Sequence, residues 1–445
     1  MTTPIQQALD AYIAQDRSRL HMPGHKGQNL PPFGPLLAYD VTEVEGTDSL
    51  FHCDGCIRDC ERAYSALYQS GDTLISCGGS TLCIQAMLFL AALSGKKKIL
   101  AARNLHLSAV NAMALLGLEP VWLYPQNGQD GWIAGAVSPA QVEELLEREE
   151  DVCCVYVTSP TYFGVLSDIP ALAEIAHRHG VPLLVDNAHG AHLPLLEPNL
   201  HPMALGADFC CDSLHKSLPV LTGGALLHLR DASLYQRAKQ AMGTFGSTSP
   251  SYLILLSIDH CLEEFAPQGR RRYAQAAQEV AQLEHLARTK GFGTLEGLRD
   301  PMKLSLFLGG RNMTGAQLGR LLREQGIEPE YLSDGGGVLM ISPYNTRRDL
   351  ERIRTFLEEC PPLTPCEEQP QPLPRLAKGM ELRQALLSPQ EEIPVEEAVG
   401  RIAASVTTTC PPGTPLVMSG EILTEKSVRF MKNSGISHVH VVKCR

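Results

Sequence analysis

Short apolar runs alternate with segments of helical periodicity from about residue 70 onward, and this alternation constrains the fold more than any other feature. Seven runs have the length and apolar content of buried strands, and segments such as 169–179 between them have helical periodicity. Strands and helices that alternate in this way are typical of βα units around a mainly parallel sheet. The expected strands are Thr73–Cys77, Lys98–Ala102, Pro120–Tyr124, Val152–Thr158, Pro182–Asp186, Asp208–Ser213 and Ala225–Leu229.

The remainder of the chain divides into parts of different character. Charged helices alternate with short strands between about 265 and 360, which predicts a smaller α/β domain. The run PPLTPCEEQPQPLP that follows is too rich in proline for a regular element. We predict an N-terminal arm (1–36), a large domain (37–264), a small α/β domain (265–362), a linker (363–377) and a C-terminal domain (378–445).

Composition excludes several classes of protein. The 38 basic and 49 acidic side chains give a net charge of -11, which disfavours a nucleic-acid-binding surface. No window approaches the roughly 20 apolar residues of a membrane span, and the N-terminus lacks the apolar stretch of a signal peptide. Fourteen cysteines, mostly within apolar runs, are typical of a reducing compartment. We therefore expect a soluble cytoplasmic protein with no nucleic-acid or membrane partner.

Two residues at the ends of expected strands carry chemistry. The apolar run before Asp186 places this carboxylate at the carboxyl edge of a parallel sheet, where open α/β sheets bind ligands. It suits a magnesium ion, a ribose hydroxyl, the ring nitrogen of pyridoxal phosphate (PLP) or a helix N-cap. Thirty residues later Lys216 stands in DSLHKSLP, directly after another apolar strand. A lone lysine is normally a solvated surface charge, but this spacing from Asp186 favours an imine-forming PLP lysine.

A PLP lysine also needs a phosphate site earlier in the domain. The turn Gly78-Gly79-Ser80-Thr81 opens an apolar helix, so its backbone N–H groups and two hydroxyls suit a phosphate dianion. An ordinary Ser/Thr N-cap is the alternative for this turn.

Together these segments resemble the basic amino-acid decarboxylases, that is, the ornithine, lysine and arginine decarboxylases among fold-type I PLP enzymes. The likeness is to the short form, without an N-terminal receiver-like domain, and it spans essentially the whole chain. It implies an aspartate aminotransferase-like large α/β domain with a mainly parallel sheet, a smaller α/β domain and a C-terminal α+β domain. The segments that carry it are LHMPGHKG (20–27), DVTEVEGTDSL (40–50), GGSTLCIQAM (78–87), ARNLHLSAV (102–110), TSPTYFG (158–164), DNAHGAH (186–192), DSLHKSLP (212–219), TSPSY (248–252) and PPGTPLVMSGE (411–421).

The resemblance implies a role for each matching residue. Lys216 would hold PLP as an internal aldimine, Asp186 would pair with the pyridine nitrogen, and His106 would stack on the ring. His189 would face the phenolic oxygen or the substrate carboxylate, with a structural role as its alternative. Residues Thr248 and Ser249 would reach the partner subunit's cofactor, which implies a homodimer with a shared active site. The other implied phosphate ligands are Ser80, Thr81, Ser213 and His215.

The expected reaction is decarboxylation of a basic amino acid to its amine through an external aldimine and a quinonoid. Arginine is the first substrate expected, then lysine or ornithine, as in polyamine biosynthesis. Thr161 would line the site near the ring. Asp48 and Glu421 are candidates for the cationic end of the substrate, with a solvated surface or cap position as the alternative for each.

Two other functions stay open at this point. Fold-type I also supports an aminotransferase or a carbon–sulfur lyase. A non-catalytic PLP-binding regulatory protein is the third reading, because Asn187 replaces the expected glutamate and Gly223 stands where glutamine is common. The spacing of Cys53, Cys56 and Cys60 is that of metal ligands, but a structural metal site would need a fourth ligand. We therefore expect reduced thiols and no metal.

Overall fold

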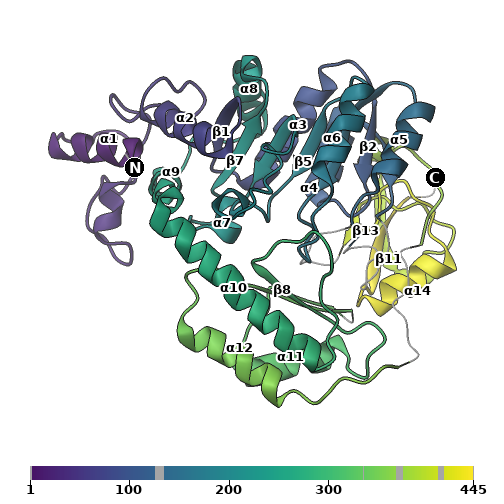
Figure 1. The fold of residues 1–445 in the computed structure, drawn as a ribbon. Coiled ribbons are helices and arrows are strands. Elements are labelled where there is room, and N and C mark those ends of the chain that lie inside the picture. The colour runs from purple at the N-terminus through teal and green to yellow at the C-terminus, as the bar shows by residue number, and fades with distance from the viewer. Residues whose placement is uncertain (1–2, 126–134, 334, 367–373, 409–414, 444–445) are drawn as a thin grey trace. The chain divides into compact units, whose positions relative to one another are not determined.

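The computed structural model describes residues 3–125, 135–333, 335–366, 374–408 and 415–443 (Figure 1). The chain forms two compact units, one of residues 1–91 and 182–275 and one of residues 92–181 and 276–445. Part of the predicted linker (367–373) and residues 411–414 of PPGTPLVMSGE lie outside the described residues.

The first unit contains four strands in the order β1 (Asp72–Ser76), β7 (Ala225–Leu229), β6 (Phe209–Asp212) and β5 (Leu183–Asp186). β5 and β6 run parallel, and β7 runs antiparallel to both β6 and β1. Every residue of these strands is buried, as expected for continuous apolar runs that are covered on both faces. β5 and β6 each end in an aspartate, so two carboxylates reach the same edge of the sheet.

Helices surround these strands, and their local sequences explain where they begin. α3 is apolar on every side and begins at Gly79, whose positive φ of 67° suits glycine. α7 is a single turn that follows β6 directly. The helices of this unit are α1 (Pro4–Ala14), α2 (Cys56–Tyr68), α3 (Gly79–Ala92), α7 (Leu214–Ser217), α8 (Tyr235–Phe245) and α9 (Tyr252–Cys261).

The second unit contains three parallel strands, with β2 (Lys98–Ala102) between β3 (Glu119–Leu123) and β4 (Val152–Thr158). β2 is followed by α4 and β4 by α6, as in βα units. The associated helices are α4 (Leu107–Leu116), α5 (Pro139–Arg148) and α6 (Ile169–Arg178).

The same unit includes a small antiparallel sheet with its own apolar core. Its strands follow the order β8, β10, β9, and α11 packs on β9 and β10. Capping boxes at Thr314 and Thr346 fix the starts of α11 and α12. The elements are α10 (Pro267–Thr289), β8 (Lys303–Phe307), α11 (Gly315–Glu324), β9 (Tyr331–Ser333), β10 (Gly336–Met340) and α12 (Arg347–Glu359).

The C-terminal part is built from two short antiparallel pairs, β11 with β14 and β12 with β13. Val395, Val417 and Val439 belong to a separate apolar cluster that holds this part together. The elements are α13 (Leu382–Leu387), β11 (Gln390–Pro394), β12 (Thr407–Thr408), β13 (Pro415–Val417), α14 (Glu425–Asn433) and β14 (His438–Val442).

The predicted α/β fold class is confirmed, with a small α/β part and a C-terminal α+β part. Three of the seven expected strands match β2, β4 and β7 residue for residue. Of the other four, β5 differs by one residue at one end, and β1, β3 and β6 differ by one residue at both ends. The domain borders stay predictions. Among the described residues, no helix combines the length and the apolar character that crossing a membrane requires.

Candidate active site

Lys216 lies in the single turn α7, at the carboxyl end of β6. The turn forms because the chain leaves the buried strand at Ser213 and closes with the Leu218 N–H bonded to the Leu214 carbonyl. The Nζ atom of Lys216 lies 3.2 Å from Nε2 of His189, within hydrogen-bond distance. The predicted lysine and one predicted histidine therefore meet.

Asp186 ends the neighbouring parallel strand, β5, and is only 2% exposed. Its Oδ1 accepts the Ala188 N–H at 3.1 Å and the Cys211 thiol at 3.6 Å. These contacts replace part of the hydration that the buried carboxyl group loses, at a place where it could pair with the ring nitrogen of PLP.

The residues around Lys216 fit PLP. An amine that can form an imine lies beside a histidine, and Asp186 is a buried carboxylate on the adjacent strand. The Oγ atom of Ser213 is buried and has no hydrogen-bond partner among the described residues, so it is available to a phosphate oxygen.

The other predicted phosphate ligands of this unit lie at the start of α3 and in α7. Ser80 is half-buried and Thr81 is exposed at the start of α3. His215 donates from Nδ1 to the Gly224 carbonyl at 3.0 Å, and burial lowers the pKa of its imidazole. The imidazole is therefore neutral near neutral pH. Its Nδ1 is used in this bond, so a phosphate contact would involve Nε2.

The local backbone geometry explains why position 223 is a glycine. Its φ is 102°, and a Cβ there would lie 3.1 Å from the Cys77 carbonyl oxygen. Its own carbonyl accepts the Gly79 N–H at 2.8 Å. The positive φ and the close contact between the two turns therefore disfavour any side chain at this position, including the glutamine expected there.

Thr248 and Ser249 lie in the segment before α9, and both are exposed. A role toward the partner subunit's cofactor stays a prediction for them.

In the second unit, His106 and Thr161 have local structural contacts. His106 is the N-cap of α4, and its Nδ1 accepts the Ser108 N–H at 3.2 Å. Thr161 is 2% exposed, and its Oγ1 accepts the Val165 N–H at 3.1 Å. These contacts fix both side chains, and their roles toward the cofactor stay predictions.

Glu421 is buried, at 5% exposed, in contact with a buried arginine. Its Oε2 lies 3.4 Å from Nη2 of Arg103 and accepts the Met418 N–H at 2.8 Å. Burial raises the pKa of the Glu421 carboxyl, and the Arg103 guanidinium opposes that rise. The solvated surface position considered for this acid is therefore wrong, and a substrate contact stays a prediction.

Asp48 takes the capping alternative. Its carboxylate accepts the backbone N–H groups of Gly55 at 3.0 Å and of Ile57 at 2.9 Å, at the start of α2. Ser49 donates a further backbone N–H at 2.8 Å. The capping role of Asp48 is therefore observed, and its contact with a cationic substrate stays a prediction.

The cysteines near the start of α2 have separate partners. The Cys53 thiol lies 3.0 Å from the Tyr235 hydroxyl, whereas the Cys56 thiol donates to the Thr47 carbonyl at 3.6 Å. Burial raises the pKa of Cys53 to about 11 and that of Cys56 to about 12. Both are therefore protonated thiols at neutral pH.

Sequence reasoning missed a buried polar cluster behind Lys216. Asp212 begins the segment DSLHKSLP, but the sequence alone assigned it no function. It contacts Asn187, His201 and His228. One signal was present, because the apolar strand before Asp212 ends in a carboxylate just as the strand before Asp186 does.

Comparisons with known proteins agree with this geometry. Sequence models of the Orn/Lys/Arg decarboxylase major domain and C-terminal domain match residues 3–296 and 370–436. The chain is 31% identical to uncharacterized protein YaaO of Bacillus subtilis, with 99% of this chain and 96% of the relative covered. It is 30% identical to the arginine decarboxylase of the same organism, over 96% of this chain and 93% of that enzyme.

Among solved structures, lysine decarboxylase A from Pseudomonas aeruginosa superposes with a TM-score of 0.83. The match covers 99% of this chain and 80% of that chain at 18% sequence identity. Structural likeness at this identity shows the shared fold, and the sequence matches show the family. The chain therefore belongs to the Orn/Lys/Arg decarboxylase family, which makes it an enzyme of the carboxy-lyase class.

Proposed function

We propose that this enzyme decarboxylates a basic amino acid, with arginine as the first candidate, using PLP held on Lys216. The single observation that carries the proposal is the position of the Lys216 amine 3.2 Å from His189, at the sheet edge where Asp186 is buried. The family of the chain supports the same chemistry.

PLP, when bound, supplies an electron sink for the charge left at the substrate Cα as carbon dioxide departs. Asp186 would hold a proton on the ring nitrogen, and its burial excludes water from that contact. His189 lies within reach of Nζ of Lys216, so it can accept a proton from this amine or return one. The free hydroxyl of Ser213 and the turn at Ser80 would bind the phosphate.

The preference for arginine is supported by the relative named arginine decarboxylase at 30% identity. Lysine and ornithine are the next candidates. The products would be the corresponding amines, as in polyamine biosynthesis.

We propose a homodimer in which Thr248 and Ser249 complete the partner subunit's phosphate site. Their exposure leaves both hydroxyls available to a second chain. A cytoplasmic location is part of the proposal, because all twelve cysteines among the described residues are free thiols.

The experiment combines an absorption spectrum with carbon dioxide release. The purified protein is supplied with PLP and then separately with arginine, lysine and ornithine. We expect a visible band from the lysine-bound cofactor, changed by one of the three amino acids with release of gas. Lys216→Ala should lose both the band and the gas, whereas Lys97→Ala, at an exposed lysine, should keep both.

Three outcomes would contradict the proposal in different ways. A band without gas from any substrate, with a keto-acid product instead, would favour an aminotransferase. A band without any product would favour a non-catalytic PLP protein. An unchanged band in Lys216→Ala would remove this lysine from the site.

A further inference from the structure

A fully buried carboxylate lies four residues before Lys216. Asp212 is 0% exposed, and its two oxygens accept hydrogen bonds from three side chains. Oδ1 accepts the Asn187 amide at 2.5 Å. Oδ2 accepts Nε2 of His201 and Nε2 of His228, each at 3.0 Å. A buried charge is stable in a protein only when such bonds replace the lost water.

The contacts of the two imidazoles define which nitrogen carries the proton. Nδ1 of His201 accepts the Met203 N–H at 3.3 Å, so the proton is on Nε2 and points to Asp212. Nδ1 of His228 lies 2.9 Å from Oγ1 of Thr73. Burial by itself raises the pKa of the Asp212 carboxyl, but the two histidines outweigh it and hold that pKa well below its usual range. The cluster is thus an ionised carboxylate among donors.

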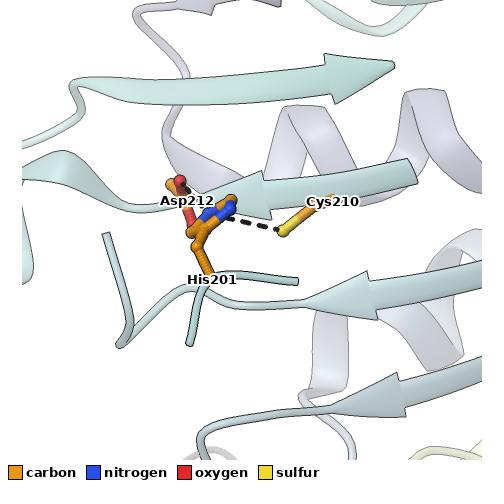
Figure 2. A group of neighbouring side chains, drawn as sticks. All are labelled: His201, Cys210 and Asp212. Carbon is orange, nitrogen blue, oxygen red and sulfur yellow. Dashed lines mark hydrogen bonds and ion pairs between the residues drawn. The ribbon is translucent and has the colours of Figure 1, made fainter. Parts of the chain in front are cut away.

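A metal ion is the competing explanation for these atoms. Figure 2 shows His201, Cys210 and Asp212, whose ligand-type atoms all lie within 4.8 Å of one another. However, Nδ1 of His201 accepts the Met203 N–H, which leaves a neutral imidazole no lone pair for a metal. Because Nε2 of His201 already donates to the carboxylate, hydrogen bonds account for the cluster better than a metal does.

The cluster anchors the loop that follows β5 at both ends. Asn187, at the start of this loop, is held by Asp212. The carbonyl of Ala191, near its end, accepts the Tyr68 hydroxyl at 2.7 Å. The Tyr68 ring in turn stacks on His228, with ring centroids 4.5 Å apart and planes 22° apart. One set of buried side chains therefore fixes both ends of the loop.

His189 lies between these two anchors. The Asn187 side chain lies against this turn and requires glycine at position 190, since a Cβ there would lie 2.1 Å from the Asn187 Oδ1. The Asn187 carbonyl also accepts the Gly190 N–H at 2.7 Å. A displaced Asn187 would therefore shift the short turn that places His189 3.2 Å from Lys216.

We propose that Asn187 and Asp212 are positioning residues for His189, which hold its imidazole at the Lys216 amine. The inference rests on the proposed function, because it assigns His189 to the proton exchange at that amine. It also explains why the loop carries asparagine at 187: a glutamate or aspartate there would face the Asp212 carboxylate.

The experiment exchanges the carboxylate and the amide between positions 187 and 212. Asn187→Asp sets two carboxylates against each other, so kcat should fall about 10- to 100-fold, the range typical of outer-shell partners, while KM changes little. Adding Asp212→Asn reverses the bond between the two residues, because the new amide donates to position 187. The amide oxygen at 212 still accepts both imidazoles. The double variant should regain most of the lost kcat. Asn187→Ala is a second single variant, which removes the donor without adding charge.

Two further measurements separate positioning from stability. The pH midpoint of the visible band reports the proton at Lys216, and it should shift in Asn187→Asp and return in the double variant. Melting temperatures of the PLP-free proteins report folding alone. Cys210→Ala is the matched control, because it alters the same cluster without touching the loop, and it should keep the wild-type band midpoint and kcat.

The inference is overturned if the double variant is no more active than Asn187→Asp, or if the band midpoint stays at its wild-type value in both single variants. A stoichiometric metal in the wild type that is lost in Cys210→Ala would also overturn it. If the wild type releases no carbon dioxide, the proposed function fails by itself, and the band midpoint still tests the positioning.

Discussion

Two fully buried carboxylates in the first unit, Glu61 and Asp212, have different kinds of hydrogen-bond partner. Glu61 lies among cations, with Nζ of Lys239 at 2.6 Å and Nη1 of Arg58 at 3.5 Å, and it also accepts the Tyr235 hydroxyl at 2.6 Å. Asp212 accepts an amide and two imidazoles instead. Both are 0% exposed.

The positions of these partners indicate which carboxylate affects folding alone and which also affects the proposed active site. The partners of Glu61 join α2, α8 and β1, and none of them belongs to the proposed site. The partners of Asp212 include the residue directly after Asp186, and Asp212 itself precedes Lys216 by four positions. We therefore expect Glu61 to matter for folding, and Asp212 to matter for activity as well.

The largest effect should come from Glu61→Ala. The variant leaves the Lys239 ammonium buried without its counter-ion, so the free energy of unfolding should fall by about 3–5 kcal/mol. Urea unfolding of the PLP-loaded enzyme measures this loss, with Glu61→Gln as the control that keeps the hydrogen-bond shape. Turnover per bound PLP should stay at the wild-type value, and a tenfold fall in it would erase the distinction between the two carboxylates.

A third buried carboxylate, Asp259, sharpens the comparison because it has weaker partners. Its Oδ2 accepts the Gln6 N–H at 2.8 Å, and burial raises its pKa to about 6. A raised folded-state pKa means that the stability from this group is complete below about pH 4 and is lost as the pH rises through about 6. The free energy of unfolding of Asp259→Asn should therefore exceed that of the wild type by about 3 kcal/mol at pH 8, and the two should be equal at pH 4. Unfolding curves at the two pH values measure this, and equal stability at pH 8 would contradict the pKa.

The sequence was sufficient for elements whose cause is local. The strands could be predicted because continuous apolar runs such as Val152–Thr158 are buried on both faces. The positions of Asp186 and Lys216 at one edge of the sheet could be predicted, because neighbouring parallel strands bring their carboxyl ends together. Asp186 ends one such run and Lys216 follows another by four residues, while their roles toward a cofactor stay predictions. The capping role of Asp48 was among the alternatives but was not preferred.

The contacts around Asp212 could not be predicted in this way. His201 lies in a loop segment and His228 inside an apolar strand, so neither shows a periodicity or a motif of its own. Their bonds to Asp212 depend on how β6, β7 and the loop before β6 pack. The reason for Gly223 was equally hidden, because it is a contact with the Cys77 carbonyl oxygen.

The smallest expected effect is the acid stability that Asp212 contributes. Its folded-state pKa is depressed, so its contribution is present above the unfolded value of about 3.9 and is lost as the pH falls through the folded value. When the pH falls from 5 to acid conditions, the free energy of unfolding should therefore fall by about 1–2 kcal/mol less in Asp212→Asn than in the wild type. This difference is in the range of a hydrogen bond to a charged group. Asp54→Asn, at an exposed carboxylate, is the control for a general change in charge. If the acid limbs of wild type and Asp212→Asn coincide, the two histidines do not hold an ionised carboxylate, and Asp212 differs from Glu61 in its partners but not in its charge.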